Sequence, residues 1–425
     1  MARNDDAEPG DAEPRDAPSR DLATGDAELL DIGPERGPGG AARALPPRAR
    51  GGLLLLTLLA VAGLVASTIA RGGAQPASPV ASPTALASGP AGSPGVTAGA
   101  TPGPGQVSSP VPVVVTTAGH HLLGVTQGWE LIARGPGVLV RIQMAAGRVT
   151  RTIVPPLLSS GWVSFVAGRN QAVIRPIDFV PGYAVPDGAP ARELPRPLQH
   201  GGPAFPGPDP DHLWVQAADA PVMMLTTFDG TPTGPTIAIP ADMSPLGATS
   251  DGAGYLLLTG IGGVYDATPR GLKRVTTGTL VAVGPTRWLV IECDDAHRCA
   301  TVVVNRADWS RHVLVDPSGH PLNIGDDPAG LVGVISPDGS TAAVFNQGPD
   351  GTTLFLLSLA TGSRRSVGVQ LDQSDQNAVW SPDGRWLFAA VANGRLAVID
   401  PHTGQYSDLE MPLPSLSQLA VRPAP

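Results

Sequence analysis

The chain has 425 residues and a formal net charge of −9, and only 15% of its residues are charged. An acidic chain without a basic stripe lacks the side chains that neutralise phosphates, so its composition excludes nucleic-acid binding as a main function. Gly (53) and Pro (47) are abundant, which is typical of turn-rich or disordered segments, and their distribution along the chain decides between the two.

The first 110 residues contain no Phe, Tyr or Trp, and the first aromatic residue is Trp129. A segment without aromatic residues does not readily build a core, so we expect the folded part to begin after about residue 110. Residues 1–50 mix acidic, basic, Pro and Gly residues without apolar periodicity. They are predicted to form a disordered cytoplasmic tail.

Residues 51–70 read GGLLLLTLLAVAGLVASTIA and carry no charge. A helix of this length, at ~1.5 Å per residue, roughly spans a hydrocarbon core of ~30 Å, and it is apolar on all sides. Arg43, Arg48 and Arg50 precede the segment, whereas Arg71 follows it alone. The positive-inside rule predicts a single-pass signal anchor in the plasma (inner) membrane with a cytoplasmic N-terminus. A cleaved signal peptide is the alternative, although the polar segment before it is long for one.

Residues 71–110 are rich in Pro, Ala, Gly and Ser and predict a flexible linker. The sequence pattern changes in residues 111–425, where short apolar runs such as WLVIEC and RLAVID alternate with clusters of Gly, Pro, Asp and Asn. No stretch of this part shows sustained helical periodicity. Residues 111–425 are therefore predicted to form an all-β domain.

A turn precedes each strong apolar run, and seven such turns recur at an average spacing of about 43 residues. This spacing matches the period of a propeller blade, so the domain is predicted to be a β-propeller of about seven four-stranded blades. One step, of 35 residues, is short and the next, of 52, is long, which suggests that the turn at 285–287 is misplaced by several residues. Ring closure is expected to use a strand from one terminus, either 111–117 or 419–423.

Two of the seven turns share the sequence Ser-Pro-Asp-Gly. Their residues are Ser336, Pro337, Asp338, Gly339 and Ser381, Pro382, Asp383, Gly384. One hypothesis makes each serine a nucleophile, but the chain contains no Gly-x-Ser-x-Gly elbow. The favoured interpretation is a tight turn, because Pro presets φ and Gly accepts a positive φ. The sequence predicts no catalytic, cofactor-binding or metal-binding residue.

The units that contain these turns read SPDGSTAAVFNQGPDGTTLFLLSLATGSRR and SPDGRWLFAAVANGRLAVIDPHTGQ. They resemble the WD40-like repeats of the TolB-type β-propeller family, and the resemblance is weak over the other five units. It implies an extracytoplasmic propeller that acts mainly by binding other proteins or ligands.

Cys293 and Cys299 are the only cysteines, and they flank a predicted hairpin turn. In the oxidising compartment that the topology predicts, they are expected to form a disulfide. The alternative is a metal site that combines both cysteines with Asp294 and His297, although no second cluster completes it.

These features predict a membrane-anchored extracytoplasmic propeller that serves as a binding scaffold at the cell envelope. Its expected partners are the membrane, through residues 51–70, and an envelope protein or ligand; no nucleic acid and no cofactor is expected. The alternative is a propeller enzyme, similar to a lactonase or a glycan hydrolase, with a site in the central channel. That hypothesis requires carboxylates or metal ligands from several blades to converge at one channel mouth.

Overall fold

The computed structural model describes residues 113–157, 162–178, 180–199, 202–218, 220–325, 330–348, 351–371 and 377–424. The predicted tail, membrane anchor and linker lie outside these ranges. Within the ranges, no helix has the length and apolar character needed to cross a membrane. The anchor at residues 51–70 therefore stays a prediction.

The described chain is almost entirely β-structure, with one 3₁₀ helix, η1 (Leu122–Gly124), and one short α-helix, α2 (Arg196–Gln199). Four sheets are antiparallel meanders of four strands. The first two consist of β5 (Val163–Ala167), β6 (Gln171–Pro176), β7 (Tyr183–Pro186) and β8 (Arg192–Glu193), and of β9 (Ala204–Pro206), β10 (His212–Gln216), β11 (Val222–Thr227) and β12 (Pro232–Ala238). The other two consist of β13 (Met243–Ser250), β14 (Leu256–Gly260), β15 (Gly263–Thr268) and β16 (Gly271–Thr276), and of β25 (Ala378–Trp380), β26 (Leu387–Ala390), β27 (Leu396–Ile399) and β28 (Tyr406–Asp408).

Two sheets are larger. The five-stranded sheet has the order β1-β4-β3-β2-β29 and consists of β1 (Val113–Thr117), β2 (Trp129–Gly135), β3 (Val138–Gln143), β4 (Arg148–Ile153) and β29 (Gln418–Pro423). The eight-stranded sheet consists of β17 (Thr279–Val283), β18 (Arg287–Cys293), β19 (Cys299–Asn305), β20 (Arg311–Val313), β21 (Leu331–Ile335), β22 (Thr341–Gly348), β23 (Gly351–Ser358) and β24 (Arg364–Leu371).

Five of the six sheets are separate blades, whereas the repeat period predicted about seven. The remaining eight strands form one sheet because β17 and β21 pair in parallel, at Ala282↔Gly333 and Val283↔Val334. A Cβ atom at Gly333 would lie 3.1 Å from Cβ of Ala282 on β17, which is tighter than an ordinary side-chain contact. The missing side chain thus lets the two strands approach closely enough to pair. The all-β propeller of four-stranded units is confirmed, and the number of separate blades is corrected.

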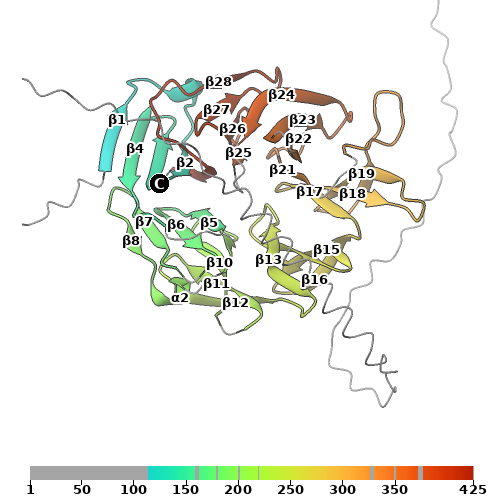
Figure 1. Cartoon of the computed structure of the whole chain (residues 1–425), viewed down its shortest axis with the longest axis horizontal. Coiled ribbons are helices and arrows are strands. Elements are labelled where there is room, and N and C mark those ends of the chain that lie inside the picture. Colours follow the sequence, from blue (N-terminus) through green and yellow to red (C-terminus); the bar gives the residue numbers. More distant parts are fainter. Residues whose placement is uncertain are drawn as a thin grey trace, which may run out of the picture. The chain divides into compact units, whose positions relative to one another are not determined.

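The first strand of each meander faces the middle of a ring (Figure 1). Contacts run from β29 through β5 and β9 to β13, from β15 to β17, and from β17 through β21 and β25 back to β29. Both terminal segments join the five-stranded sheet: β29 pairs with β2 as its innermost strand, and β1 pairs with β4 as its outermost strand. The C-terminal segment therefore closes the ring, and the N-terminal segment adds a fifth strand outside it.

The seven turns found in the sequence all lie directly before the second strand of a meander, including the turn at 285–287, which precedes β18. The suspected misplacement of that turn is wrong. The long step arises instead between β20 and β21, where an extended segment carries its own bridge, Val315↔Pro321. The short step arises because β16 and β17 are separated by only a tight connection.

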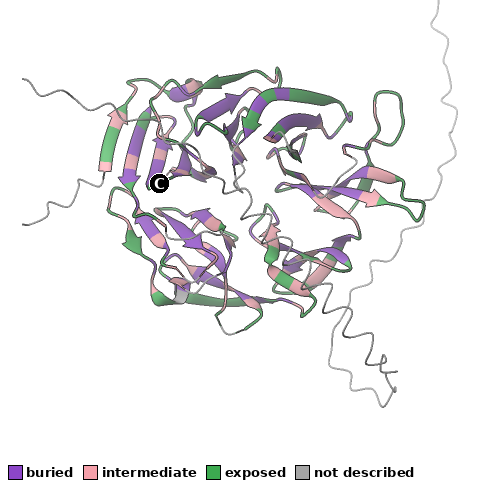
Figure 2. Ribbon diagram, in the orientation of Figure 1, coloured by how far each residue is buried: buried purple, intermediate pink, exposed green. Residues whose placement is uncertain are grey.

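Buried side chains line the facing surfaces of neighbouring sheets, and exposed residues gather on the outer strands (Figure 2). Trp214 and Trp288 are fully buried. Their indole N–H groups donate to Gly254 O at 2.8 Å and to Asp251 O at 3.2 Å. A buried indole N–H needs such an acceptor. These two side chains therefore hold the turn between β13 and β14 from both neighbouring sheets.

Candidate functional site

The first Ser-Pro-Asp-Gly turn is closed by its own side chains. Ser336 Oγ donates to Asp338 Oδ1 at 2.6 Å and accepts a hydrogen bond from Thr341 N at 3.0 Å. Gly339 adopts a φ of 73°, which favours glycine over residues with a side chain. The serine hydroxyl is buried inside the turn, and none of its described partners is a histidine.

The second turn repeats this geometry. Ser381 Oγ donates to Asp383 Oδ1 at 2.6 Å and accepts from Trp386 N at 2.9 Å, and Gly384 has a φ of 69°. The two turns differ in their surroundings. Arg287 Nη1 donates to the carbonyl oxygen of Gly339 at 2.9 Å, whereas no described side chain donates to the carbonyl of Gly384.

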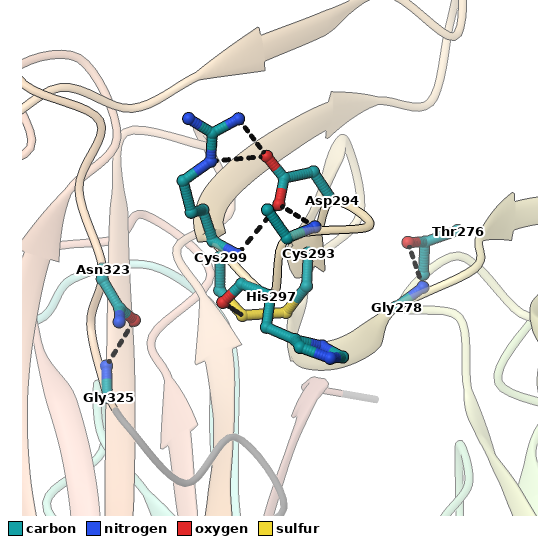
Figure 3. The surroundings of a disulfide bond; sticks show 10 residues. Thr276, Gly278, Cys293, Asp294, His297, Cys299, Asn323 and Gly325 are labelled. Atoms are coloured by element: carbon teal, nitrogen blue, oxygen red, sulfur yellow. Dashed lines mark hydrogen bonds and ion pairs between the residues drawn. A yellow bond between two sulfur atoms is a disulfide. The ribbon is translucent and has the colours of Figure 1, made fainter.

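A disulfide joins Cys293 and Cys299, which face each other at the paired ends of β18 and β19 (Figure 3). Asp294 forms an ion pair of 2.6 Å with Arg298, and the side chain of His297 points away from Asp294 (Figure 3). The Arg298 guanidinium and backbone N–H lower the pKa of the Asp294 carboxyl. The alternative metal site is therefore wrong, because neither sulfur is a free thiolate and the carboxylate already has a cation. In the described part of the chain, no group of three or more His, Cys, Asp or Glu residues is placed to hold a metal ion.

A pocket of about 440 Å³ lies among three turns of the eight-stranded sheet. Two turns belong to its first meander, before β18 and after β19, and the third is the first Ser-Pro-Asp-Gly turn. The residues that line it are Pro285, Thr286, Arg287, Asn305, Arg306, Ala307 and Asp338. It is an open hollow at the surface and not an enclosed cavity.

Arg306 forms a wall of this pocket and is held from inside the fold. Its guanidinium forms an ion pair with the carboxylate of Asp251 and also donates to the carbonyl oxygen of that residue. It lies 4.8 Å from the ring centre of Trp288, at cation–π distance. Asp251 is fully buried and accepts hydrogen bonds from Ala253 N and Tyr255 N. The charge of Arg306 is thus compensated before any ligand arrives.

Asp266, on β15, adds a second carboxylate to the surroundings of this ion pair. Burial raises the pKa of Asp266 to about 6, and the negative charge of Asp251 adds to the rise, while Arg306 and Lys273 oppose it. Its Oδ1 atom is buried and has no hydrogen-bond partner among the described residues. Lys273 lies over the ring of Trp309, with Nζ 3.7 Å from the ring centre.

Three charged residues line the pocket, and two of them, Arg287 and Asp338, form no ion pair among the described residues. Asp338 Oδ1 accepts from Ser336 Oγ, from Ser340 N at 3.0 Å and from Ser340 Oγ at 2.9 Å. Partial burial by itself raises the pKa of Asp338, but these hydrogen bonds lower it on balance, so the carboxylate is ionised at neutral pH. The pocket therefore presents one positive and one negative charge that are not paired with each other.

The sequence identified Asp338 as a turn residue and did not identify the pocket. Arg287 belongs to a turn that served only to measure the repeat, and nothing local marks Arg306. Arg287 contacts Gly339 across 52 residues, and Arg306 contacts Asp251 across 55. These separations exceed one repeat, so the contacts depend on how neighbouring units pack and leave no local pattern.

No family model matches the sequence, and no curated protein sequence matches it significantly. Solved structures similar to this chain include a putative 6-phosphogluconolactonase from Bacteroides fragilis, at 12% identity and a TM-score of 0.43, over 70% of this chain and 98% of its own. TolB from Acinetobacter baumannii is similar over 71% of this chain and 68% of its own, at 11% identity and a TM-score of 0.37. Apo AztD from Citrobacter koseri is similar over 70% and 98%, at 13% identity and a TM-score of 0.38. TolB and other β-propellers are thus among the structures to which this chain is similar, and its own sheet topology is what shows the propeller arrangement.

Proposed function

We propose that the chain is a single-pass membrane protein that displays its propeller outside the cell as a binding scaffold at the envelope. Residues 51–70 support the anchor, since they are uncharged and long enough to span a bilayer. The arginines at 43, 48 and 50 support a cytoplasmic N-terminus. The partner in this proposal is an extracytoplasmic protein or envelope ligand.

The pocket of the eight-stranded sheet is the observation that carries the binding role. It is concave, it is built from turns that the fold holds in place, and it leaves Arg287 and Asp338 without ion-pair partners among the described residues. A few polar groups that converge in a preformed pocket are typical of ligand sites. An enzyme with a site in the central channel has no comparable feature among the described residues to support it, so binding is the function we advance.

The proposal includes a ring of seven functional blades, in which each half of the eight-stranded sheet counts as one blade. Two features support this count. Each half is a complete antiparallel meander, β17 to β20 and β21 to β24, with its own inner strand. A buried apolar cluster packs these halves against each other, and it includes Leu289, Ile291, Val344 and Phe355. Packing of this kind is what neighbouring blades do elsewhere in the ring.

The location is tested on the full-length chain with one epitope tag at each terminus. Wall-free cells that express it are treated with an external protease. The C-terminal tag should be lost and the N-terminal tag retained. Deletion of residues 51–70 is the control, and it should move the chain out of the membrane fraction. A C-terminal tag that resists protease until the cells are permeabilised would overturn the proposed orientation.

A further inference from the structure

We propose that the pocket binds a small zwitterion, meaning an amino acid or short peptide that carries a free ammonium and a free carboxylate. This inference rests on the proposed binding function and names its ligand class. It follows from the two opposite charges of Arg287 and Asp338, which line one pocket without forming an ion pair with each other. A ligand with both charges satisfies the two groups at once.

Arg287 supplies the carboxylate end of the site. Its Nη1 is held by the Gly339 carbonyl at 2.9 Å, which fixes the side chain while leaving further N–H donors of the guanidinium. The turn also packs closely here, because a Cβ at Gly339 would lie 2.6 Å from Thr286 Oγ1. A guanidinium held in this way is suited to bind a carboxylate through two parallel hydrogen bonds.

Asp338 supplies the ammonium end. Its Oδ1 is occupied by three donors from Ser336 and Ser340, so the carboxylate is oriented by its own turn. Its Oδ2 receives no hydrogen bond among the described contacts and is available as an acceptor. Asp383 occupies the same position in the second turn but does not line the pocket. The pocket charge thus depends on the placement of Asp338 beside Arg287, and the turn by itself does not create it.

The remaining lining selects against ligands with a single sign of charge. The charge of Arg306 is compensated by Asp251, so this residue adds little net attraction for anions. An inorganic phosphate would meet Asp338, and a simple amine would meet Arg287. Asn305 Oδ1 accepts from Ala307 N at 3.1 Å, which leaves the amide N–H₂ as a donor to a ligand carbonyl. Thr286 adds a hydroxyl at the rim.

The test is isothermal titration calorimetry on the full-length chain in nanodiscs. The probes are alanine, dialanine and trialanine, which separate the two charges by increasing lengths. N-acetyl-dialanine keeps only the carboxylate, dialanine amide keeps only the ammonium, and inorganic phosphate is a plain anion. At least one zwitterion should bind saturably, and each capped form of dialanine should bind at least tenfold more weakly than dialanine itself if dialanine is the preferred length. If another length binds best, its own capped forms are used.

Variants assign the two charges. Asp338→Asn keeps the Oδ1 acceptor that closes the turn and removes the charge, and Arg287→Gln removes the other charge. Each should weaken binding of the zwitterion at least tenfold. Asp383→Asn and Arg385→Gln make the same changes at the second turn, where no pocket lies, and should bind as the wild type does. A thermal melt of each variant shows that it is folded.

Three results would overturn the inference: no saturable binding of any zwitterion, equal binding of the capped forms, or undiminished binding by either pocket variant. Preferential binding of phosphate would also overturn it. These outcomes are independent of the protease test of orientation. The propeller can bind a zwitterion even if the proposed membrane orientation is wrong. The proposed orientation can likewise be right even if the pocket binds no zwitterion.

Discussion

The buried charges around Glu130 in the sheet that closes the ring are paired with one another, whereas Arg287 and Asp338 in the pocket of the eight-stranded sheet form no ion pair among the described residues. In the closing sheet, the fully buried Glu130 accepts hydrogen bonds from Arg141 at 2.6 Å, from Gln143 at 2.8 Å and from Arg422 at 2.9 Å. Arg422 also donates to Asp187 at 2.6 Å. In the pocket, Arg287 and Asp338 lie near solvent without such partners.

The difference follows from burial. A charge removed from water costs several kcal/mol unless ion pairs and hydrogen bonds compensate it, so the closing network has to be complete. A charge at the rim of a pocket stays hydrated and needs no partner in the fold. The complete network around Glu130 therefore marks a structural position, and the unpaired charges of Arg287 and Asp338 mark a position where a ligand can contribute the missing partner.

The largest effect is expected from Arg422→Met, which breaks the closing network. Met fills much of the same volume but leaves Glu130 and Asp187 with fewer donors. Loss of one partner of a buried ion pair costs about 3–5 kcal/mol, so the free energy of unfolding in urea should fall by roughly that amount. Arg395→Met is the matched control, since Arg395 pairs with Asp408 on the surface, and it should cost less than about 1 kcal/mol.

The pH dependence of the stability lost in Arg422→Met tests whether that loss comes from the charge of Glu130. Burial by itself raises the pKa of Glu130, but the hydrogen bonds from Arg141, Gln143 and Arg422 lower it on balance. A carboxyl with a lowered folded-state pKa stabilises the fold above its unfolded pKa, and this stability is lost as the pH falls through the folded value. The difference between wild type and Arg422→Met should therefore be full at neutral pH and shrink below the ordinary glutamate pKa of 4.5. A difference that stays constant down to acid pH would contradict the charge-based account.

A smaller loss of stability is expected from Arg306→Met. This variant allows an ion-paired arginine to be compared with an arginine of the same pocket that forms no ion pair. Arg306 lines the pocket but is paired with the buried Asp251, so its removal leaves that carboxylate short of a donor. We expect a loss of about 2 kcal/mol in the free energy of unfolding, less than for Arg422 because Arg306 is partly exposed. Arg287→Met, in the same pocket, should cost only about 1 kcal/mol, because it loses one hydrogen bond, to the Gly339 carbonyl, and breaks no ion pair. Equal losses of unfolding free energy for the two arginines would contradict the distinction between ion-paired and unpaired charges.

Local signals in the sequence were enough for the fold, because a blade is a run of short hairpins. Pro382 and Gly384 fix a turn through their own backbone preferences, and the strands on either side follow from alternating apolar runs. The parallel pairing that merges two blades was not predictable, since it depends on Gly333 meeting Ala282. Neither position stands out in its own strand.

The site was less predictable than the fold. Glu130 and Arg422 are 292 residues apart, and only closure of the ring brings them together. The pocket residues lie on three turns whose relative placement is set by inter-blade packing. The repeat period indicates that such turns are neighbours, but it does not indicate which charges stay unpaired. That information comes from side-chain contacts in the assembled ring.

The smallest effect is expected from Asp266→Asn, and it is a gain. Burial and the charge of Asp251 raise the pKa of Asp266 to about 6, so the ionised form costs stability at neutral pH. The neutral amide removes this cost, and after a discount for solvent screening we expect a gain of about 1 kcal/mol at pH 7.5. The folded-state pKa is raised, so the gain should shrink as the pH falls from about 6 toward the ordinary aspartate pKa of 3.8. Asp295→Asn, at an exposed position, should change nothing. Because Asp266 lies near an ion pair that is already complete, a loss of stability at pH 7.5 would show that its charge is needed by Arg306 or Lys273.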